Sequence, residues 1–257
     1  MPSPVLPVLA LDTATEVIAA GVCVDARAGA AAFTQTAPGG ALASTQLLPL
    51  LRSLLSRAGI EWLDIGAIAY GQGPGAFTGL RTACAVAQGL GFGIGCRLLP
   101  IDSLLIVAED ARLQACPQAH LPDPCEVAVA MDARMDEAYC ARYRWQGGRW
   151  HVVQAPALVT LPALNAAWSA LPPQGVVAGS ALAAFGDRLS LPAGCQRIPC
   201  EGDRAAALLR LAQRAALDSE GVDPADALPL YLRDKVALTT AERAAVKARP
   251  TPAAGPP

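Results

Sequence analysis

Two short stretches carry the residue types that could do chemistry in this sequence of 257 residues. The first is Asp12-Thr13-Ala14-Thr15, which comes directly after an apolar run. Its carboxylate and hydroxyls could hold a magnesium ion or a phosphate. The same residue types also form Asx-type turns, in which side chains bind neighbouring backbone N–H groups, and for this short stretch the turn is the simpler interpretation.

The second stretch is the glycine-rich loop Gly71-Gln72-Gly73-Pro74-Gly75. The apolar run 63–70 predicts a buried strand before it, and helical spacing follows over residues 77–93. A strand, a glycine loop and a helix N-terminus in succession can bind an anion on free backbone N–H groups. The loop is neither a dinucleotide fingerprint nor a P-loop, because no Gly-Lys-Ser/Thr follows it. An anion or nucleotide bound by the two stretches would meet Asp12, Thr13, Gly73, Gly75 and Thr78.

Little else in the sequence suggests catalysis or metal binding. The two histidines, His120 and His151, lack the spacing of a metal pair, and no Gly-x-Ser-x-Gly elbow is present for a hydrolase. The eight cysteines are scattered without a Cys-x-x-Cys pair, so we expect neither a zinc site nor a disulfide framework. We therefore predict no catalytic residue and no metal ligand.

The composition indicates a soluble globular protein. Apolar residues make up 53% of the chain, and a net charge of −2 provides no general attraction to nucleic acid. No basic segment of a signal peptide precedes an apolar one at the start, and no run reaches the roughly 18 apolar residues of a membrane span. We expect a cytoplasmic protein with no membrane contact.

Two helical patterns could form a contact surface. The first has leucines at helical spacing before Gly59, although ordinary core is the simpler interpretation of one such face. In the second, Gly79, Ala83, Ala87 and Gly91 recur every fourth residue, which lets another element approach closely, within the fold or between subunits. The residues predicted at an interface are Leu47, Leu50, Leu51, Leu54, Gly79, Ala83 and Ala87.

The order of elements in the first half of the chain repeats in the second. An apolar run that ends at Asp12, and another that ends at Asp132, are each followed by a turn and two more strand patterns. We predict one lobe over residues 1–117, a second over 118–240 whose helix 203–217 could pack back on the first, and a disordered Ala/Pro-rich tail over 241–257. Strands are expected at 5–12, 17–24, 30–36, 63–70, 98–101, 126–131, 138–145, 150–159, 175–178 and near Ile198, and helices at 44–58, 77–93, 104–116, 161–171, before Phe185 and at 203–217.

Four segments occur in an order and at a spacing that resemble a known family. They are residues 10–15, 70–81, 131–135 and 229–233. Together they resemble the TsaB (YeaZ) family of the bacterial machinery that makes threonylcarbamoyladenosine (t6A) in tRNA. The resemblance implies an α/β fold of the actin-like, sugar-kinase-like (ASKHA) type, with two duplicated lobes of mixed sheets flanked by helices.

The resemblance also implies a non-catalytic subunit. Such a subunit pairs with the related TsaD, which carries the metal and transfers the threonylcarbamoyl group to adenosine 37, together with the ATPase TsaE. It implies a homodimer in isolation, a contact surface on the first two helices, and tRNA reached only through the complex. No cofactor is expected in the isolated chain, with ATP or ADP held only at an interface with a partner.

The residues themselves are consistent with a degenerate site. An active kinase of this class needs glycine-rich phosphate turns in both lobes, and neither the turn at Asp12 nor the one at Asp132 contains glycine. The chain also departs from the family pattern, with Ser44, Gln72 and Ala76 where histidine, arginine and serine are frequent. The last two departures remove a cation and a hydroxyl from the glycine loop. The alternatives are an ATP- or carbamoyl-handling enzyme and, as a weaker one, a peptidase.

Overall fold

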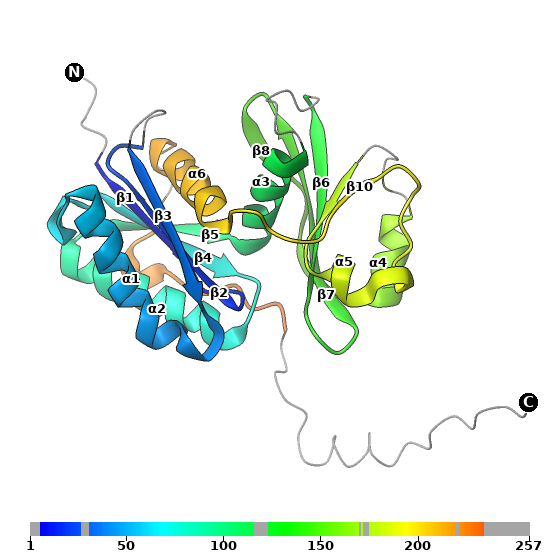
Figure 1. The fold of residues 1–257 in the computed structure, drawn as a ribbon, viewed down its shortest axis with the longest axis horizontal. Helices are drawn as coiled ribbons and strands as arrows, with labels where there is room; N and C mark the ends of the chain where they lie inside the picture. The colour runs from blue at the N-terminus through cyan, green and yellow to red at the C-terminus, as the bar shows by residue number, and fades with distance from the viewer. Residues whose placement is uncertain are drawn as a thin grey trace, which may run out of the picture.

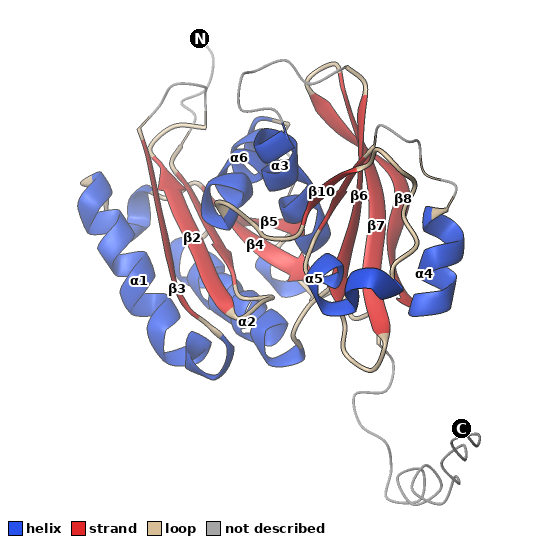
Figure 2. Ribbon diagram, turned by 45° about the vertical axis from the view of Figure 1, so that its right-hand side comes forward, coloured by secondary structure: helices blue, strands red, loops and turns tan. Residues whose placement is uncertain are grey.

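The computed structural model has two lobes, each built around a five-stranded sheet (Figures 1 and 2). It describes residues 6–26, 31–115, 123–169, 171, 175–218 and 221–233. The predicted tail at 241–257 and His120 lie outside the described residues. Within the described residues, no helix has both the length and the apolar character that a bilayer crossing requires.

The first sheet is a meander extended by two parallel strands. Its strand order is β3-β2-β1-β4-β5, with β1, β2 and β3 antiparallel and β1, β4 and β5 parallel. Helices connect the parallel strands, as this topology requires. The strands are β1 (Val8–Asp12), β2 (Val17–Cys23), β3 (Ala32–Pro38), β4 (Ala67–Gly73) and β5 (Arg97–Asp102).

The second sheet repeats the plan of the first. Its order is β10-β9-β6-β7-β8, so both sheets run from the third strand of a meander through the second and first to two parallel strands. The predicted duplicated α/β fold is therefore confirmed. The strands are β6 (Cys125–Asp132), β7 (Glu137–Gln146), β8 (Arg149–Thr160), β9 (Val176–Ala178) and β10 (Gln196–Ile198).

Helices cover both faces of both sheets. Helices α1 and α2 pack on one face of the first sheet, and α6 packs on the other. Helix α3 lies between the lobes and covers the inner face of the second sheet, whereas α4 and α5 cover its outer face. The helices are α1 (Ala43–Ala58), α2 (Phe77–Ile94), α3 (Ser103–Ala115), α4 (Leu161–Trp168), α5 (Ala181–Phe185) and α6 (Arg204–Leu217).

The largest difference from the sequence-based expectation is the start of β4. This strand begins at Ala67 rather than at residue 63, because Trp62–Asp64 forms a 3-10 turn in which the Asp64 carboxylate accepts the N–H of Glu61 at 2.7 Å. Smaller differences occur at β3, which spans Ala32–Pro38, and at the end of α4, which stops at Trp168. At β4 a short polar turn overrides the hydrophobic pattern.

The α3 side of the molecule joins the lobes through buried polar contacts. Glu109 on α3 accepts hydrogen bonds from Arg112 at 2.9 Å, from Arg210 of α6 at 2.7 Å and from Trp150 of β8 at 3.0 Å. Burial would raise the pKa of Glu109, but these hydrogen bonds outweigh it and the pKa lies below its ordinary value. Glu109 therefore remains ionised at neutral pH and connects elements of both lobes.

Helix α2 approaches the turn after β1 so closely that only glycine fits at residue 79. A Cβ on Gly79 would lie 1.8 Å from the carbonyl oxygen of Thr13, whose hydroxyl donates to the Gly79 carbonyl at 2.6 Å. A Cβ on Gly89 of the same helix would meet no neighbouring group within 4 Å. The small-residue pattern of α2 therefore serves close packing within the chain at Gly79.

We predict that Gly79→Ala lowers the free energy of unfolding by about 2 to 3 kcal/mol, because helix and turn must move apart. Gly89→Ala is the matched control and should raise it by about 0.5 to 1 kcal/mol through helix propensity alone. Urea unfolding monitored by circular dichroism measures both. Equal effects of the two changes would contradict the close approach.

Candidate functional site

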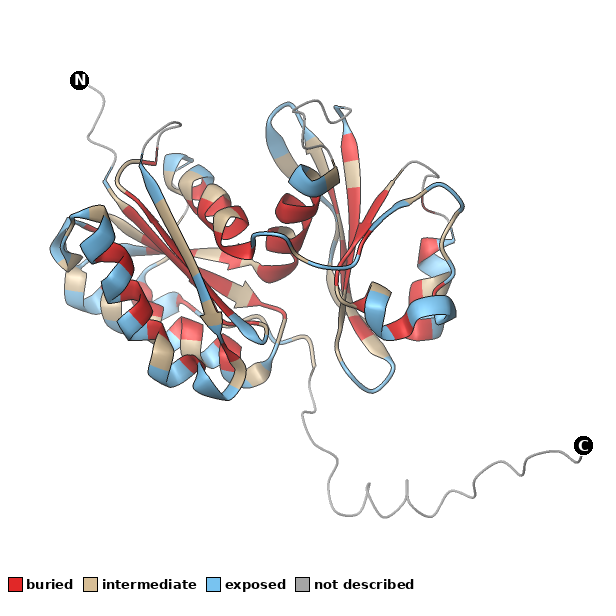
Figure 3. Cartoon of the chain, viewed as in Figure 1, coloured by how far each residue is buried: buried red, intermediate tan, exposed pale blue. Residues whose placement is uncertain are grey.

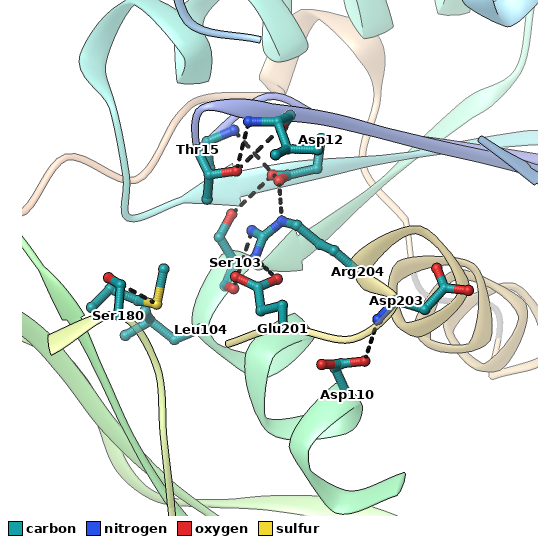
Figure 4. Close-up of polar contacts among 12 residues, drawn as sticks. Asp12, Thr15, Ser103, Leu104, Asp110, Ser180, Glu201, Asp203 and Arg204 are labelled. Carbon is teal, nitrogen blue, oxygen red and sulfur yellow. Dashed lines mark hydrogen bonds and ion pairs between the residues drawn. The ribbon is translucent and has the colours of Figure 1, made fainter. Parts of the chain in front are cut away.

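The carboxylate of Asp12, at the end of β1, is completely buried and paired with an arginine. Arg204, the first residue of α6, donates from Nε to Asp12 Oδ2 at 2.8 Å, and its own side chain is 5% exposed (Figure 4). Room for the carboxylate comes from the neighbouring strand, where a Cβ on Gly71 would lie 1.7 Å from Asp12 Oδ1. The end of β1 therefore holds a buried ion pair.

Further polar groups complete the network around this pair. Ser103 Oγ, at the start of α3, donates to Asp12 Oδ1 at 3.2 Å and accepts the N–H of Gly73 at 3.1 Å. The second side of the guanidinium meets Glu201, with Arg204 Nη1 and Glu201 Oε2 2.7 Å apart. Both oxygens of Asp12 are thus engaged by groups of the protein.

Electrostatics keep the Arg204 guanidinium charged. Burial alone would lower the pKa of Arg204, but the charges of Asp12 and Glu201 outweigh it and raise the pKa above its ordinary value. A buried charge is tolerated only where an opposite charge and hydrogen bonds compensate its lost hydration. The guanidinium of Arg204 would have to move away from Asp12 Oδ2 before this oxygen could bind a metal ion or accept a proton from a substrate.

The glycine loop is packed against the turn that follows β1. The N–H of Ala76 donates to the carbonyl of Ala14 at 2.8 Å, and a Cβ on Gly75 would lie 2.5 Å from that same oxygen. The N–H of Gly73 is taken by Ser103, as described above. Two N–H groups of the loop are therefore used within the protein, and its glycines permit close backbone packing.

The residues predicted to bind an anion or a nucleotide do not form one accessible site. Asp12, Thr13 and Gly73 are buried, and their polar groups bond within the chain. Gly75 is partly exposed and lines an interlobe cleft, and Thr78 is exposed but is not part of the lining of that cleft. Gln72, where the family pattern has a cation, donates to the carbonyl of Leu228 at 3.2 Å.

The cleft between the lobes has a volume of about 800 Å³. The turn after β1, the glycine loop, the turn after β6 and residues 230–233 all line it. Thr15, Glu201 and Arg204 also reach it. Among the residues that the structure describes, no cluster of three or more histidine, cysteine, aspartate or glutamate side chains could hold a metal ion.

The turn after β6 is built differently from a phosphate-binding turn. Three successive residues without a glycine, Arg134, Met135 and Asp136, have left-handed φ angles of 65°, 58° and 57°. The N–H of Arg134 bonds the Asp132 carboxylate at 2.8 Å, and the N–H of Glu137 bonds the Arg134 carbonyl at 3.1 Å. These two N–H groups are satisfied locally, and Arg134, Met135 and Asp136 are exposed residues.

The side chains predicted at a partner interface lie inside the first lobe. Leucines 47, 51 and 54 and alanines 83 and 87 have no exposed area, Leu50 is 5% exposed, and Gly79 is buried. Figure 3 shows buried and exposed residues alternating along both helices. They pack between α1, α2 and the first sheet, because the apolar stripe of each helix faces the strands. This corrects the assignment of those side chains, and a partner that meets these helices would contact their outer faces instead.

The outer surface of this helical layer carries apolar residues of its own. Phe92 on α2 is 62% exposed, Leu48 on α1 is 46% exposed, and Leu42 just before α1 is 48% exposed. In the sequence, Leu48 stands out only as a residue off the main stripe.

The residue that decides the chemistry of the site was not predicted from the sequence. Arg204 lies 192 residues from Asp12, and Ser103 and Glu201 were not recognised as its neighbours. One signal was available: a cation at the first position of a helix is disfavoured by the helix dipole. An arginine there, at the start of a helix rich in alanine and leucine, indicates a specific acidic partner.

The chain is similar to known proteins along both of its lobes. Residues 41–248 match the family model described as TsaD, tRNA N6-adenosine threonylcarbamoyltransferase. Over 236 residues the chain is 30% identical to the tRNA threonylcarbamoyladenosine biosynthesis protein TsaB of Escherichia coli K12, covering 90% of this chain and 96% of that protein. The TsaB protein of Haemophilus influenzae is 35% identical over 134 residues, 52% of each chain.

Solved structures show the same similarity. The structure of YeaZ from Pseudomonas aeruginosa superposes with a TM-score of 0.75 at 32% identity, covering 88% of this chain and 100% of that one. A second P. aeruginosa structure, described as similar to the peptidase YeaZ, gives a TM-score of 0.76 at 32% identity, covering 89% of this chain and 100% of that one.

We predict that Arg204→Met lowers the free energy of unfolding by about 3 to 5 kcal/mol, because Asp12 remains buried without a counter-charge. Adding Asp12→Asn to this variant should recover part of the loss. Arg210→Met is the matched control on the same helix: its side chain is 35% exposed and Glu109 keeps Arg112, so we expect a loss of about 1 kcal/mol or less. Urea unfolding distinguishes them, and equal losses would contradict this account.

Proposed function

The chain belongs to the TsaB (YeaZ) family of tRNA threonylcarbamoyladenosine biosynthesis proteins, and from this we propose that it is a non-catalytic subunit of the t6A complex. It binds and activates a TsaD-type transferase together with the ATPase TsaE. Because the matching family model is itself described for the transferase, subunit and partner share one fold.

The observation that supports the absence of catalysis is the buried pair of Asp12 and Arg204. The carboxylate at the end of β1 is the candidate magnesium ligand of the first lobe, and it is buried beside Arg204, which reaches the interlobe cleft. General acid–base chemistry and metal binding both require a carboxylate that can reach its proton or ion. Arg204 and Ser103 occupy both oxygens of this one.

Partner binding is proposed at the outer faces of α1 and α2. Leu48 and Phe92 place exposed apolar area on adjacent helices of one layer, and Arg52, one turn after Leu48 on α1, is also exposed. Apolar side chains surrounded by polar ones are typical of protein interfaces. In isolation the same surface pairs two copies of this chain, and in the complex it meets the transferase.

The remaining parts of the proposal concern ligands and place. The isolated chain needs no cofactor, and ATP or ADP is held only where a partner completes a site. A net charge of −2 favours tRNA binding by the partner rather than by this chain. The cytoplasm is the proposed location.

Reconstitution tests the function directly. TsaD, TsaE and the threonylcarbamoyl-adenylate synthase are combined with tRNA, with or without this chain, and t6A is measured by mass spectrometry of digested tRNA. We expect modification only when the chain is present. Undiminished modification without it would overturn the proposal, and ATP turnover by the isolated chain that is lost in Asp12→Ala would favour the enzyme alternative.

A pair of variants tests the proposed surface. Phe92→Glu on α2 should lower the affinity for TsaD by about tenfold or more, because it places a charge in an apolar contact. Loss of co-elution with TsaD in gel filtration measures this. Val152→Glu on β8 of the second lobe is the matched control, since Val152 is 63% exposed, close to the 62% of Phe92. Equal binding by both variants, with circular dichroism unchanged, would exclude this surface.

A further inference from the structure

Residues 228–233, which we call the strap, contact both lobes. The preceding residues follow the first lobe, where Val222 pairs with Leu98 of β5 and Ala227 is buried. The strap then ends between the lobes, on the other side of the molecule from α3 (Figure 1, orange). Residues 230–233 form part of the wall of the interlobe cleft.

Backbone hydrogen bonds attach the strap to the glycine loop of the first lobe. The N–H of Leu230 donates to the carbonyl of Gln72 at 2.7 Å. The carbonyl of Leu228 accepts from the Tyr70 hydroxyl at 3.3 Å and from the Gln72 side chain at 3.2 Å. Gly73 permits this approach, because a Cβ there would lie 2.8 Å from the carbonyl oxygen of Leu230.

An aromatic contact attaches the strap to the start of α2. The rings of Tyr231 and Phe77 lie 5.2 Å apart between centroids. Arg81 packs over the Phe77 ring at 3.8 Å and donates from Nε to the Tyr231 hydroxyl at 3.0 Å. Ring contact, cation–π contact and hydrogen bond together fix the position of Tyr231 on the first lobe.

Arg233 attaches the strap to the second lobe. Its Nη2 lies 2.9 Å from the carbonyl oxygen of Ala133 and 2.7 Å from Glu137 Oε2, at the two ends of the turn after β6. Its Nη1 lies 3.5 Å from the sulfur of Met135. The turn contains three residues in the left-handed region, each unfavourable by about 1 kcal/mol or more, so it depends on contacts such as these.

From these contacts we infer that the strap limits how far the interlobe cleft can open. Leu230 is bonded to the first lobe and Arg233 to the second, and the chain between them spans at most about 10 Å when extended. On the α3 side, the hydroxyl of Tyr143 on β7 donates to Asp102 of β5 at 2.5 Å. The lobes are therefore tied on two sides of the cleft, and wider opening has to break one end of the strap.

The experiment removes the contact at one end of the strap and measures the amide hydrogen exchange rate at the other end. It uses the full chain, with exchange resolved to single residues. Tyr231→Ser removes the contact with the first lobe, and we expect exchange at Ala133 and Glu137 of the second lobe to rise by about fivefold or more. Arg233→Met removes the contact with the second lobe, and we expect a similar rise at Leu230 and Leu80 of the first.

Two controls separate this coupling from local loosening. Arg188→Met removes a contact of 3.0 Å with Asp136 of the same turn from within the second lobe, and should leave Leu230 and Leu80 unchanged. Tyr231→Phe keeps the ring, folds as the wild type does, and should show a smaller effect than Tyr231→Ser. Changes confined to the mutated end, or an equal effect of Arg188→Met at the far end, would overturn the inference.

Discussion

The ion pair between Arg204 and Asp12 is the contact on which both the site and the first lobe depend. It places a cation directly beside the carboxylate at the end of β1, whose two oxygens are both hydrogen-bonded within the protein. The same contact anchors the start of α6 on the first sheet, against β1 and β2. Because removal of Arg204 leaves the Asp12 carboxylate buried without a counter-charge, the interaction stabilises the fold.

Most secondary structure could be predicted from hydrophobic periodicity, and so could the duplication. Runs that end at Asp12 and Asp132 became equivalent strands of two sheets with the same order. The largest error is at the start of β4, which a local turn determines. The capping box of Glu61 and Asp64 shifts this start to Ala67, and a hydropathy pattern contains no information about such a hydrogen bond.

The site was less predictable, since its residues meet only through tertiary structure. Asp12 could be recognised as a candidate, but its partner lies 192 residues away on another element. The small residues of α2 correctly indicated close approach, although periodicity cannot say what approaches. For Gly79 it is the carbonyl of Thr13, and for Gly91 it is Leu98 and Pro224. An apolar or small-residue face has the same sequence signature whether its own sheet or another subunit covers it.

The return of α6 to the first sheet has a consequence for biosynthesis. Val8, Ala10, Ala69 and Leu99 of that sheet form one core cluster with Ala207, Leu208 and Ala212 of α6. A ribosome that has made all strands of the first lobe has therefore not yet made the helix that covers this face. This apolar face of the first sheet lacks its covering helix until the strands of the second lobe have been translated. Exposed apolar surface makes a nascent chain prone to aggregation and able to bind chaperones.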